Sequence, residues 1–366
     1  SDSYKGALTL RLLGTTSLSS MSGVVFHNYI SADQSSLGET VVTIDDTVVL
    51  NGKIRSATYG QNCKGDGGVF KDTNGNILLY PSLSQNGVTW TGDDDSGYTL
   101  SITAPGSYKL MDSFTYAPYT KENRLSIVEG GVTLDLNGNT ITAQRDDSNA
   151  GDTAFISVSD TSLTINGNGG GITTTGQSFD SYKACMFLAG KNAQLTINSG
   201  TFTSEGIVIS ENGEVKGSEP VYNNPSIVLN GGTFISEEST PIYMTADGGK
   251  LTVANGVTIQ GNTAGIEIRS GTATINGGTI TATGTTNYPA RSDVPANPIA
   301  DGSAIVQVSK PNAYDATISL NIAGDATEST SSNGAAIRNY VRSGDGKTDH
   351  TASDETIKIA ITGTPK

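Results

Sequence analysis

A short sequence pattern that occurs seven times after residue 133 limits the possible folds of this chain more than any other feature. Each copy joins a short strand, with apolar residues at alternate positions, to a turn and a second short strand. The copies begin at Leu134, Leu163, Leu195, Ile227, Leu251, Ala273 and Ile318, and their first turn residues are spaced by 29, 32, 32, 24, 22 and 45 residues. A unit of about 22 residues cannot bury its apolar side chains alone, so the repeat predicts a solenoid of stacked units.

A third apolar run lies between successive copies. These runs begin at Ala154, Ala184, Ile207, Pro241, Gly265, Ala304 and Ala336. Three strands per repeat, each pairing in parallel with its equivalents in neighbouring repeats, predict a right-handed parallel β-helix over residues 106–366. Alternation within the strands directs Leu195 and Ile197, or Ile266 and Ile268, towards the interior.

The first turn position is asparagine in six of the seven copies. These residues are Asn137, Asn166, Asn198, Asn230, Asn276 and Asn321, and the remaining copy has Ala254. Asparagine tolerates left-handed turn geometry, and its amide can bond to equivalent amides in the units above and below. We therefore expect a structural asparagine ladder and not a row of catalytic amides.

The composition agrees with an all-β protein and limits its partners. Glycine accounts for 45 of the 366 residues, charged residues make up only 16%, and no segment keeps helical spacing of apolar residues. The net charge of −14, without a cluster of Lys and Arg, argues against a nucleic-acid partner. No apolar run approaches the roughly 18 residues that span a bilayer, so we expect no membrane insertion within this chain. Cys63 and Cys185 lie in no metal-type spacing, and we expect two unpaired thiols.

Residues 1–105 follow a different pattern. They contain longer β-like runs, separated by Gly and Asp clusters, without a shared period. This is typical either of a separate sandwich or of a β-rich N-terminal capping region, which covers the apolar core and open sheet edge of a solenoid's first coil. We favour the cap, with a boundary near Ala104, Pro105 and Gly106.

Two segments resemble a known family. GSYKLMDSF from Gly106 and LSIVEGGVTLDLNGNTIT from Leu125 are similar to the opening of right-handed parallel β-helix (pectate-lyase-like) domains in large bacterial surface proteins, and LTINGGTI-type coils follow in both. The resemblance covers residues 106–366 and implies a secreted or cell-surface bacterial protein. It does not imply one activity, because this fold serves pectate lyases, polygalacturonases and adhesins alike.

Catalytic patterns of those enzymes are missing. His27 and His350 lie outside the regular coils, so a histidine acid or base is not expected in the solenoid body. Asp146 and Asp147 are interpreted as a solvated turn. We predict no catalytic residues, although Arg269 leaves open a lyase that removes a sugar proton with a basic side chain.

The outer face of the third strands offers a binding site instead. Its candidate glycan-binding residues are Tyr243, Glu267, Arg269, Arg338 and Tyr340, with Thr245 between them. Three insertions, at residues 144–152, 211–225 and 284–302, provide loops beside the coils. Asp93, Asp94 and Asp95 form the densest acidic run and are weak candidates for Ca²⁺, the one cofactor we consider.

The sequence thus predicts a noncatalytic extracellular surface module, adhesin-like or glycan-binding, whose partner is an extracellular glycan or a host or cell-surface ligand. Two alternatives stay open: a polysaccharide lyase or glycoside hydrolase that acts on an extracellular polysaccharide, and a structural spacer.

Overall fold

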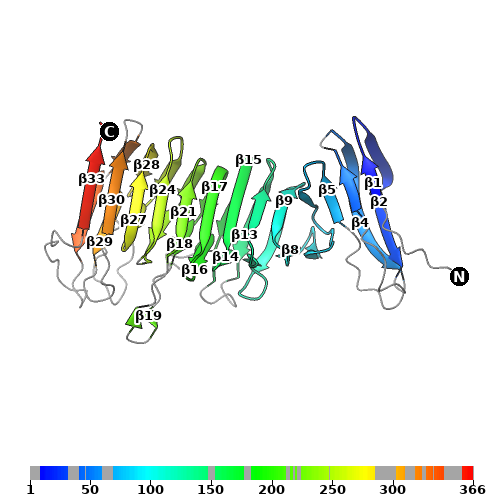
Figure 1. Ribbon diagram of the computed structural model, residues 1–366, viewed down its shortest axis with the longest axis horizontal. Helices are drawn as coiled ribbons and strands as arrows, with labels where there is room; N and C mark the ends of the chain where they lie inside the picture. Colours follow the sequence, from blue (N-terminus) through cyan, green and yellow to red (C-terminus); the bar gives the residue numbers. More distant parts are fainter. Residues whose placement is uncertain are drawn as a thin grey trace.

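The computed structural model describes residues 9–31, 41–45, 47–59, 69–146, 153–176, 183–211, 215–216, 219–220, 224–246, 248–284, 302–309, 318–323, 327–332, 334–341 and 357–365. The named elements within these ranges are all β-strands, and most strand pairs are parallel. The prediction of an all-β chain with long parallel sheets is therefore confirmed, and the arrangement is consistent with a β-helix-like solenoid. Figure 1 shows the strands side by side along one long axis, with β1 and β33 at opposite ends.

The first two runs of each repeat lie in one large sheet. Its first-run strands are β9 (Gly106–Leu110), β12 (Val132–Asp135), β15 (Ser162–Thr175), β17 (Gln194–Ser204), β21 (Ser226–Leu229), β24 (Lys250–Val253), β27 (Gly271–Ile275), β30 (Ile318–Ala323) and β33 (Ile357–Thr362). The second runs are β10 (Phe114–Tyr119), β13 (Thr140–Arg145), β22 (Thr233–Ser236), β25 (Thr258–Gly261), β28 (Gly278–Ala282) and β31 (Thr327–Ser331), together with the second halves of β15 and β17.

The third runs form a separate parallel sheet. Its strands are β11 (Leu125–Ser126), β14 (Ile156–Ser159), β16 (Met186–Ala189), β18 (Ile209–Glu211), β23 (Ile242–Met244), β26 (Ala264–Ile268), β29 (Ser303–Ser309) and β32 (Ile337–Val341). Beside it, β19 (Val215–Lys216) and β20 (Glu219–Pro220) pair with each other in antiparallel fashion.

The stack extends beyond the seven copies found in the sequence. Strands β9, β10 and β11 pair with β12, β13 and β14, so a further three-strand unit begins at Gly106. At the other end, β33 pairs with β30 and begins one more unit. The sequence did not reveal the first of these because its turn, with Met111 and Asp112, has no Asn-Gly pair.

The N-terminal part contributes strands to the same large sheet. These are β1 (Thr9–Leu12), β3 (Val41–Ile44), β5 (Val69–Asp72), β6 (Ile77–Leu79), β7 (Val88–Asp93) and β8 (Gly97–Ile102), while β2 (Ser17–Ser31) and β4 (Val49–Tyr59) form a parallel pair of their own. Thr9, Val41 and Val69 stand in register, 32 and 28 residues apart. The expectation that these strands share no spacing is corrected here, because β1, β3 and β5 stack in parallel much as the later repeats do.

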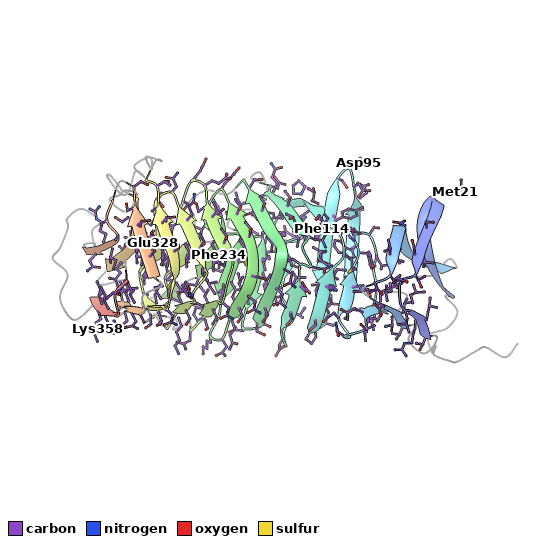
Figure 2. All side chains as sticks on the ribbon, turned by 90° about the horizontal axis from the view of Figure 1, so that it is seen from above. Met21, Asp95, Phe114, Phe234, Glu328 and Lys358 are labelled. Atoms are coloured by element: carbon purple, nitrogen blue, oxygen red, sulfur yellow. The ribbon has the colours of Figure 1, made fainter. Side chains whose placement is uncertain are left out.

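The interior consists of columns of equivalent side chains. In one column each residue is at most 3% exposed: Leu134, Ile165, Ile197, Leu229, Val253, Ile275 and Ile322. In another, the rings of Phe202 and Phe234 stack with centroids 5.3 Å apart and planes inclined by 12°. Phe234 is labelled within the stack in Figure 2. Repetition of the same residue type in each unit is what lets these columns fill without voids.

Turns between the first and second runs use the left-handed backbone that the Asn-Gly pairs favour. Asn137 and Gly138 have φ of 51° and 80°, and Asn168 and Gly169 have φ of 50° and 91°. Two successive residues at positive φ are costly for most side chains and easy for Asn followed by Gly. Of the six predicted turn asparagines only Asn137 has this geometry, so the expectation of left-handed turns at Asn166, Asn198, Asn230, Asn276 and Asn321 is corrected.

Two hydrophobic cores meet near the start of the regular stack. The larger extends from Leu79 to Ile322, and the smaller contains Val42, Ile44, Ile54, Phe70, Leu78 and Leu83. Leu78 and Leu79 are neighbours on β6 and enter different cores, because successive side chains of a strand point to opposite faces. Strand β6 pairs with β9 on one side and β5 on the other, so both cores share one sheet.

Candidate functional site

Three of the five predicted glycan-binding residues lie together, Tyr243 on β23, Glu267 on β26 and Arg269 directly after β26. Glu267 stands beside Tyr243 in the parallel register. The Nε of Arg269 donates to the Oε1 of Glu267 over 2.6 Å, and its guanidinium carbon lies 5.0 Å from the centre of the Tyr243 ring. The cation is therefore held by a carboxylate and an aromatic face at once.

This cluster is largely enclosed, which corrects the expectation of an open ribbon. Glu267 is 0% and Tyr243 8% exposed, Thr245 is buried, and the Arg269 side chain is 19% exposed. Tyr243 packs against Ala184 and Ile207, which precede the neighbouring strands β16 and β18. Alternation predicts that Tyr243 points outwards, and Ala184 and Ile207 pack against it there. An enclosed ion pair has little surface to offer a polysaccharide.

The remaining predicted residues of this face lie two strands further along. Val306 pairs with Glu267 on one side and Arg338 on the other, so an apolar residue separates the two charged positions. Arg338 is partly exposed, and Tyr340 follows it on β32, paired with Val308. The five predicted residues therefore do not form one continuous binding surface.

Glu211 is a buried acid in the same sheet. It ends β18 and is 0% exposed. Its Oε1 accepts a hydrogen bond from the backbone N–H of Ala246 at 3.3 Å, and its Oε2 has no hydrogen-bond partner. Burial raises the pKa of Glu211 from 4.5 to about 8, against the smaller lowering effect of the Ala246 and Thr245 backbone. The side chain is thus protonated at neutral pH.

The asparagine ladder has three members. Asn198 donates to the Oδ1 of Asn166 at 2.8 Å, and Asn230 donates to the Oδ1 of Asn198 at 2.9 Å. Ala254 occupies the next position in the column, followed by the exposed Asn276. An amide row of this kind stabilises the stacking of turns.

Asn137 and Asn321 stand two residues away from the ladder, which corrects the predicted alignment. Asp135 is the partner of Asn166, and Asn321 pairs with Thr274. Asn137 donates instead to the carbonyl of Leu110 at 3.2 Å. A shift by two residues preserves the alternation of apolar side chains, so the sequence pattern alone does not exclude it.

The acidic run predicted as a weak calcium site forms the turn of the β7–β8 hairpin. The Oδ1 of Asp93 accepts hydrogen bonds from the backbone N–H of Ser96 at 2.8 Å and from its hydroxyl at 2.7 Å, and these lower the pKa of Asp93. Asp95 is exposed at the tip (Figure 2). In the described part of the chain, no three His, Cys, Asp or Glu side chains gather in a way that suits a metal ion.

Several other sequence predictions concern residues with little or no described surroundings. Cys63, Asp147 and His350 lie outside the described residues, as do most of the insertions at 144–152, 211–225 and 284–302. Cys185 is a free, fully buried thiol, and burial raises its pKa to about 12. Such a thiol is unreactive at neutral pH.

The structure also contains a groove of about 650 Å³ where the two cores meet, which the sequence did not indicate. Its described lining comes from β4 and the turn before it, the turn after β6, the β7–β8 hairpin, the segment that joins β9 to β10, and the start of β10. The lining residues are Val48, Leu50, Ile54, Tyr80, Pro81, Asp93, Asp94, Gly97, Tyr98, Met111, Asp112, Ser113, Phe114 and Thr115. Of these, only Asp93 and Asp94 belonged to a predicted site.

The groove combines an apolar wall with tyrosines and carboxylates. Val48, Leu50 and Met111 are partly buried and pack against the smaller core. The Tyr98 hydroxyl donates to the Oδ1 of Asp94 at 2.8 Å. Burial and the nearby carboxylates raise the pKa of Tyr98 to about 12, and burial together with Asp112 raises the pKa of Tyr80. Both hydroxyls therefore stay protonated at neutral pH.

Comparison with protein-family models, with curated proteins and with solved structures finds no match to the chain. Its function must therefore be argued from the geometry of its own residues. No helix in the described ranges is long and apolar enough to cross a membrane.

Nothing in the local sequence marks the groove residues. Tyr80 stands before Pro81 in a turn, and Asp112 lies in the turn between β9 and β10. Aspartate is ordinary in a turn, and Tyr80 and Asp112 come together only because β6 and β9 are adjacent in the sheet. The groove could have been predicted from the sequence only by first predicting that β6 pairs with β9.

Proposed function

We propose that this chain is a noncatalytic extracellular surface module that binds a glycan in the groove between its two cores. In this proposal residues 106–366 form a right-handed parallel β-helix of three strands per coil, and residues 1–105 form the β-rich region before it. The observation that carries the proposal is the lining of the groove, where Tyr80, Tyr98 and Asp112 border an apolar wall.

The chemistry of a sugar suits such a lining. A sugar ring has an apolar face of C–H groups and a rim of hydroxyls. The apolar face packs on side chains such as Val48, Leu50 and Met111, while carboxylates accept hydrogen bonds from hydroxyls and tyrosine both donates and accepts them. Binding sites of small ligands typically combine an apolar lining with a few directed polar groups, and they often lie where two cores meet.

Two observations favour binding over catalysis. The pKa of Asp93 is lowered, so this carboxyl is ionised at neutral pH and unsuited to act as a general acid. Arg269, the residue that a lyase mechanism would use, is committed to the enclosed pair with Glu267. The proposal therefore places recognition in the groove and assigns Arg269 a structural role.

A glycan array followed by calorimetry tests this function. Tyr80→Phe removes a hydroxyl group from the groove and Asp112→Asn replaces a carboxylate by an uncharged amide, whereas Glu238→Gln changes an exposed acid on a distant turn. We expect specific binding to at least one glycan class, weakened about tenfold by each groove variant and unchanged in the control, since a hydrogen bond to a charged group is worth about 1.5–3 kcal/mol. Turnover of a bound polysaccharide, or binding that both groove variants leave intact, would refute the proposal.

A further inference from the structure

The two walls of the groove belong to different hydrophobic cores. Leu50 and Ile54 of β4 lie in or against the smaller core, whereas Tyr98 and Phe114 belong to the larger one. The two cores share a sheet at β6, which has only three residues. The width of the groove therefore depends on the contacts that hold the two cores together around β6.

The side chain of Gln85 makes such a contact between β5 and β6. These strands pair in antiparallel fashion at Lys71 and Ile77, so Phe70 and Leu78 would form the next pair of the ladder and exchange backbone hydrogen bonds. The N–H of Phe70 instead donates to the Oε1 of Gln85 at 2.8 Å, and the Nε2 of Gln85 donates to the carbonyl of Leu78 at 2.6 Å. The amide of Gln85 thus stands where a ladder bond between the two strands would lie.

The backbone of Gln85 is held by the other core. Its N–H donates to the carbonyl of Val88 at 2.8 Å, and the N–H of Val88 donates to the carbonyl of Gln85 at 2.9 Å. Val88 belongs to the larger core, whereas Phe70 and Leu78 belong to the smaller one. Gln85 itself is 0% exposed. One buried residue therefore joins a strand of the larger core to two strands that contribute to the smaller core.

We propose that Gln85 is a positioning residue of the groove, which holds the smaller core against the larger one and so fixes the distance between the groove walls. This inference rests on the proposed function only in assigning the groove a ligand. A preformed site avoids the cost of ordering its walls when a ligand binds. Loss of the amide would leave the N–H of Phe70 and the carbonyl of Leu78 buried without this partner, and a shift of one core that admits water would relieve them.

Double electron–electron resonance between two spin labels measures the relative position of the cores without any sugar. One label is attached at Val49→Cys, which is exposed at the start of β4, and the other at Thr142→Cys, which is exposed on β13, in a chain that carries Cys63→Ser. The thiol of Cys185 is fully buried and stays unlabelled. We expect one narrow distance distribution, and a distribution at least about twofold wider for Gln85→Met, which keeps the length of the side chain but removes the amide.

Gln307→Met is the matched control. Gln307 is also 0% exposed, but its amide has no hydrogen-bond partner and it pairs with Ile268 inside the larger stack. This variant should leave the distribution unchanged. Labels at Thr142 and Gln260, two exposed residues of the larger stack, should keep their distribution in every variant. Gln85→Asn, whose amide is one methylene group shorter, should also widen the distribution, and it decides the question if circular dichroism shows that Gln85→Met does not fold.

The outcomes separate positioning from simple stabilisation. An unchanged distribution in Gln85→Met or, where that variant does not fold, in Gln85→Asn would overturn the inference, even if the melting temperature falls, because Gln85 would then only stabilise the fold. Equal widening in Gln307→Met would also overturn it, as would a broad distribution before any change at Gln85. No sugar takes part, so none of these results bears on glycan binding, which the array and calorimetry test separately.

Discussion

Arg269 donates its Nε hydrogen to the Oε1 of Glu267 over 2.6 Å, in a place where Glu267 is wholly removed from solvent. Glu267 Oε2 has no hydrogen-bond partner, so Arg269 is the described cation on which the carboxylate depends. Taking a carboxylate out of water is costly unless a partner compensates it. Removal of Arg269 should therefore cost more than removal of the whole pair.

The first prediction follows from this pair. Arg269→Ala should lower the free energy of unfolding by about 3–5 kcal/mol, because it leaves a buried charge uncompensated. The double variant Glu267→Leu, Arg269→Met should lose much less, and Lys250→Ala, an exposed change on β24, should lose almost nothing. Urea denaturation followed by circular dichroism gives all three values. Equal losses in the single and double variants would show that the pair has no such role.

The buried Glu211 should make the stability of the folded chain depend on pH. Its pKa is raised from 4.5 to about 8 in the folded chain, so folding favours the protonated form. The stability is greatest below pH 4.5 and falls as the pH rises towards 8, after which this carboxyl contributes no further change. Full ionisation should cost roughly a few kcal/mol.

The variant Glu211→Gln isolates this effect. It keeps the shape of the side chain and cannot ionise, so its melting temperature should fall less than that of the wild type between pH 5 and pH 9. Glu237→Gln, a change of an exposed acid, serves as the control and should follow the wild type. Parallel melting curves for Glu211→Gln and wild type would refute the prediction.

The asparagine ladder gives a third prediction. Asn198 bonds to both Asn166 and Asn230, so Asn198→Ala removes two side-chain hydrogen bonds. With a net value of about 0.5–1.5 kcal/mol for each bond, the loss should be about 1–3 kcal/mol. Asn276→Ala is the matched control, since its neighbour in the column is Ala254, and it should lose less than about 0.5 kcal/mol. The two variants should separate clearly in the same urea titration, and identical midpoints would count against the ladder.

The stacked rings of Phe202 and Phe234 give a fourth prediction. Both are 0% exposed, and Phe234→Ala should lower stability by about 3–5 kcal/mol through the cavity that it leaves. Phe202→Ala alone and the double variant complete a mutant cycle, whose coupling energy should be about 0.5–1.5 kcal/mol. A coupling energy near zero would show that ring stacking adds nothing beyond burial.

Much of the all-β, mostly parallel architecture could be predicted from the sequence because the chain repeats the same pattern of residues. Alternation at Leu195 and Ile197 identifies the inward face, and recurrence of the same pattern indicates parallel stacking. The register between paired strands is harder to predict than the fold class, because a shift of one strand by two residues keeps every side chain on the same face of the sheet. That is why Asn137 and Asn321 were assigned to the ladder, although Asp135 and Ala323 occupy the corresponding positions.

The site was less predictable than the fold. Alternation predicts the direction of Tyr243 but not that Ala184 and Ile207 pack against it. The groove depends on contacts between residues far apart in the sequence, such as Leu50, Tyr98 and Asp112. A local sequence pattern does not predict such contacts. The groove is recognised only in the structure, where β6 pairs with β9.

Hydrogen–deuterium exchange in the presence of a glycan that the array shows to bind tests directly whether the groove is the binding site. Bound oligosaccharide should slow exchange in peptides that cover residues 80–98 and 110–115, and Asp112→Asn should reduce this protection. Peptides that cover residues 243–269 should exchange at the same rate with and without ligand. Protection confined to 243–269, or protection at neither place by a ligand that calorimetry shows to bind, would contradict the account.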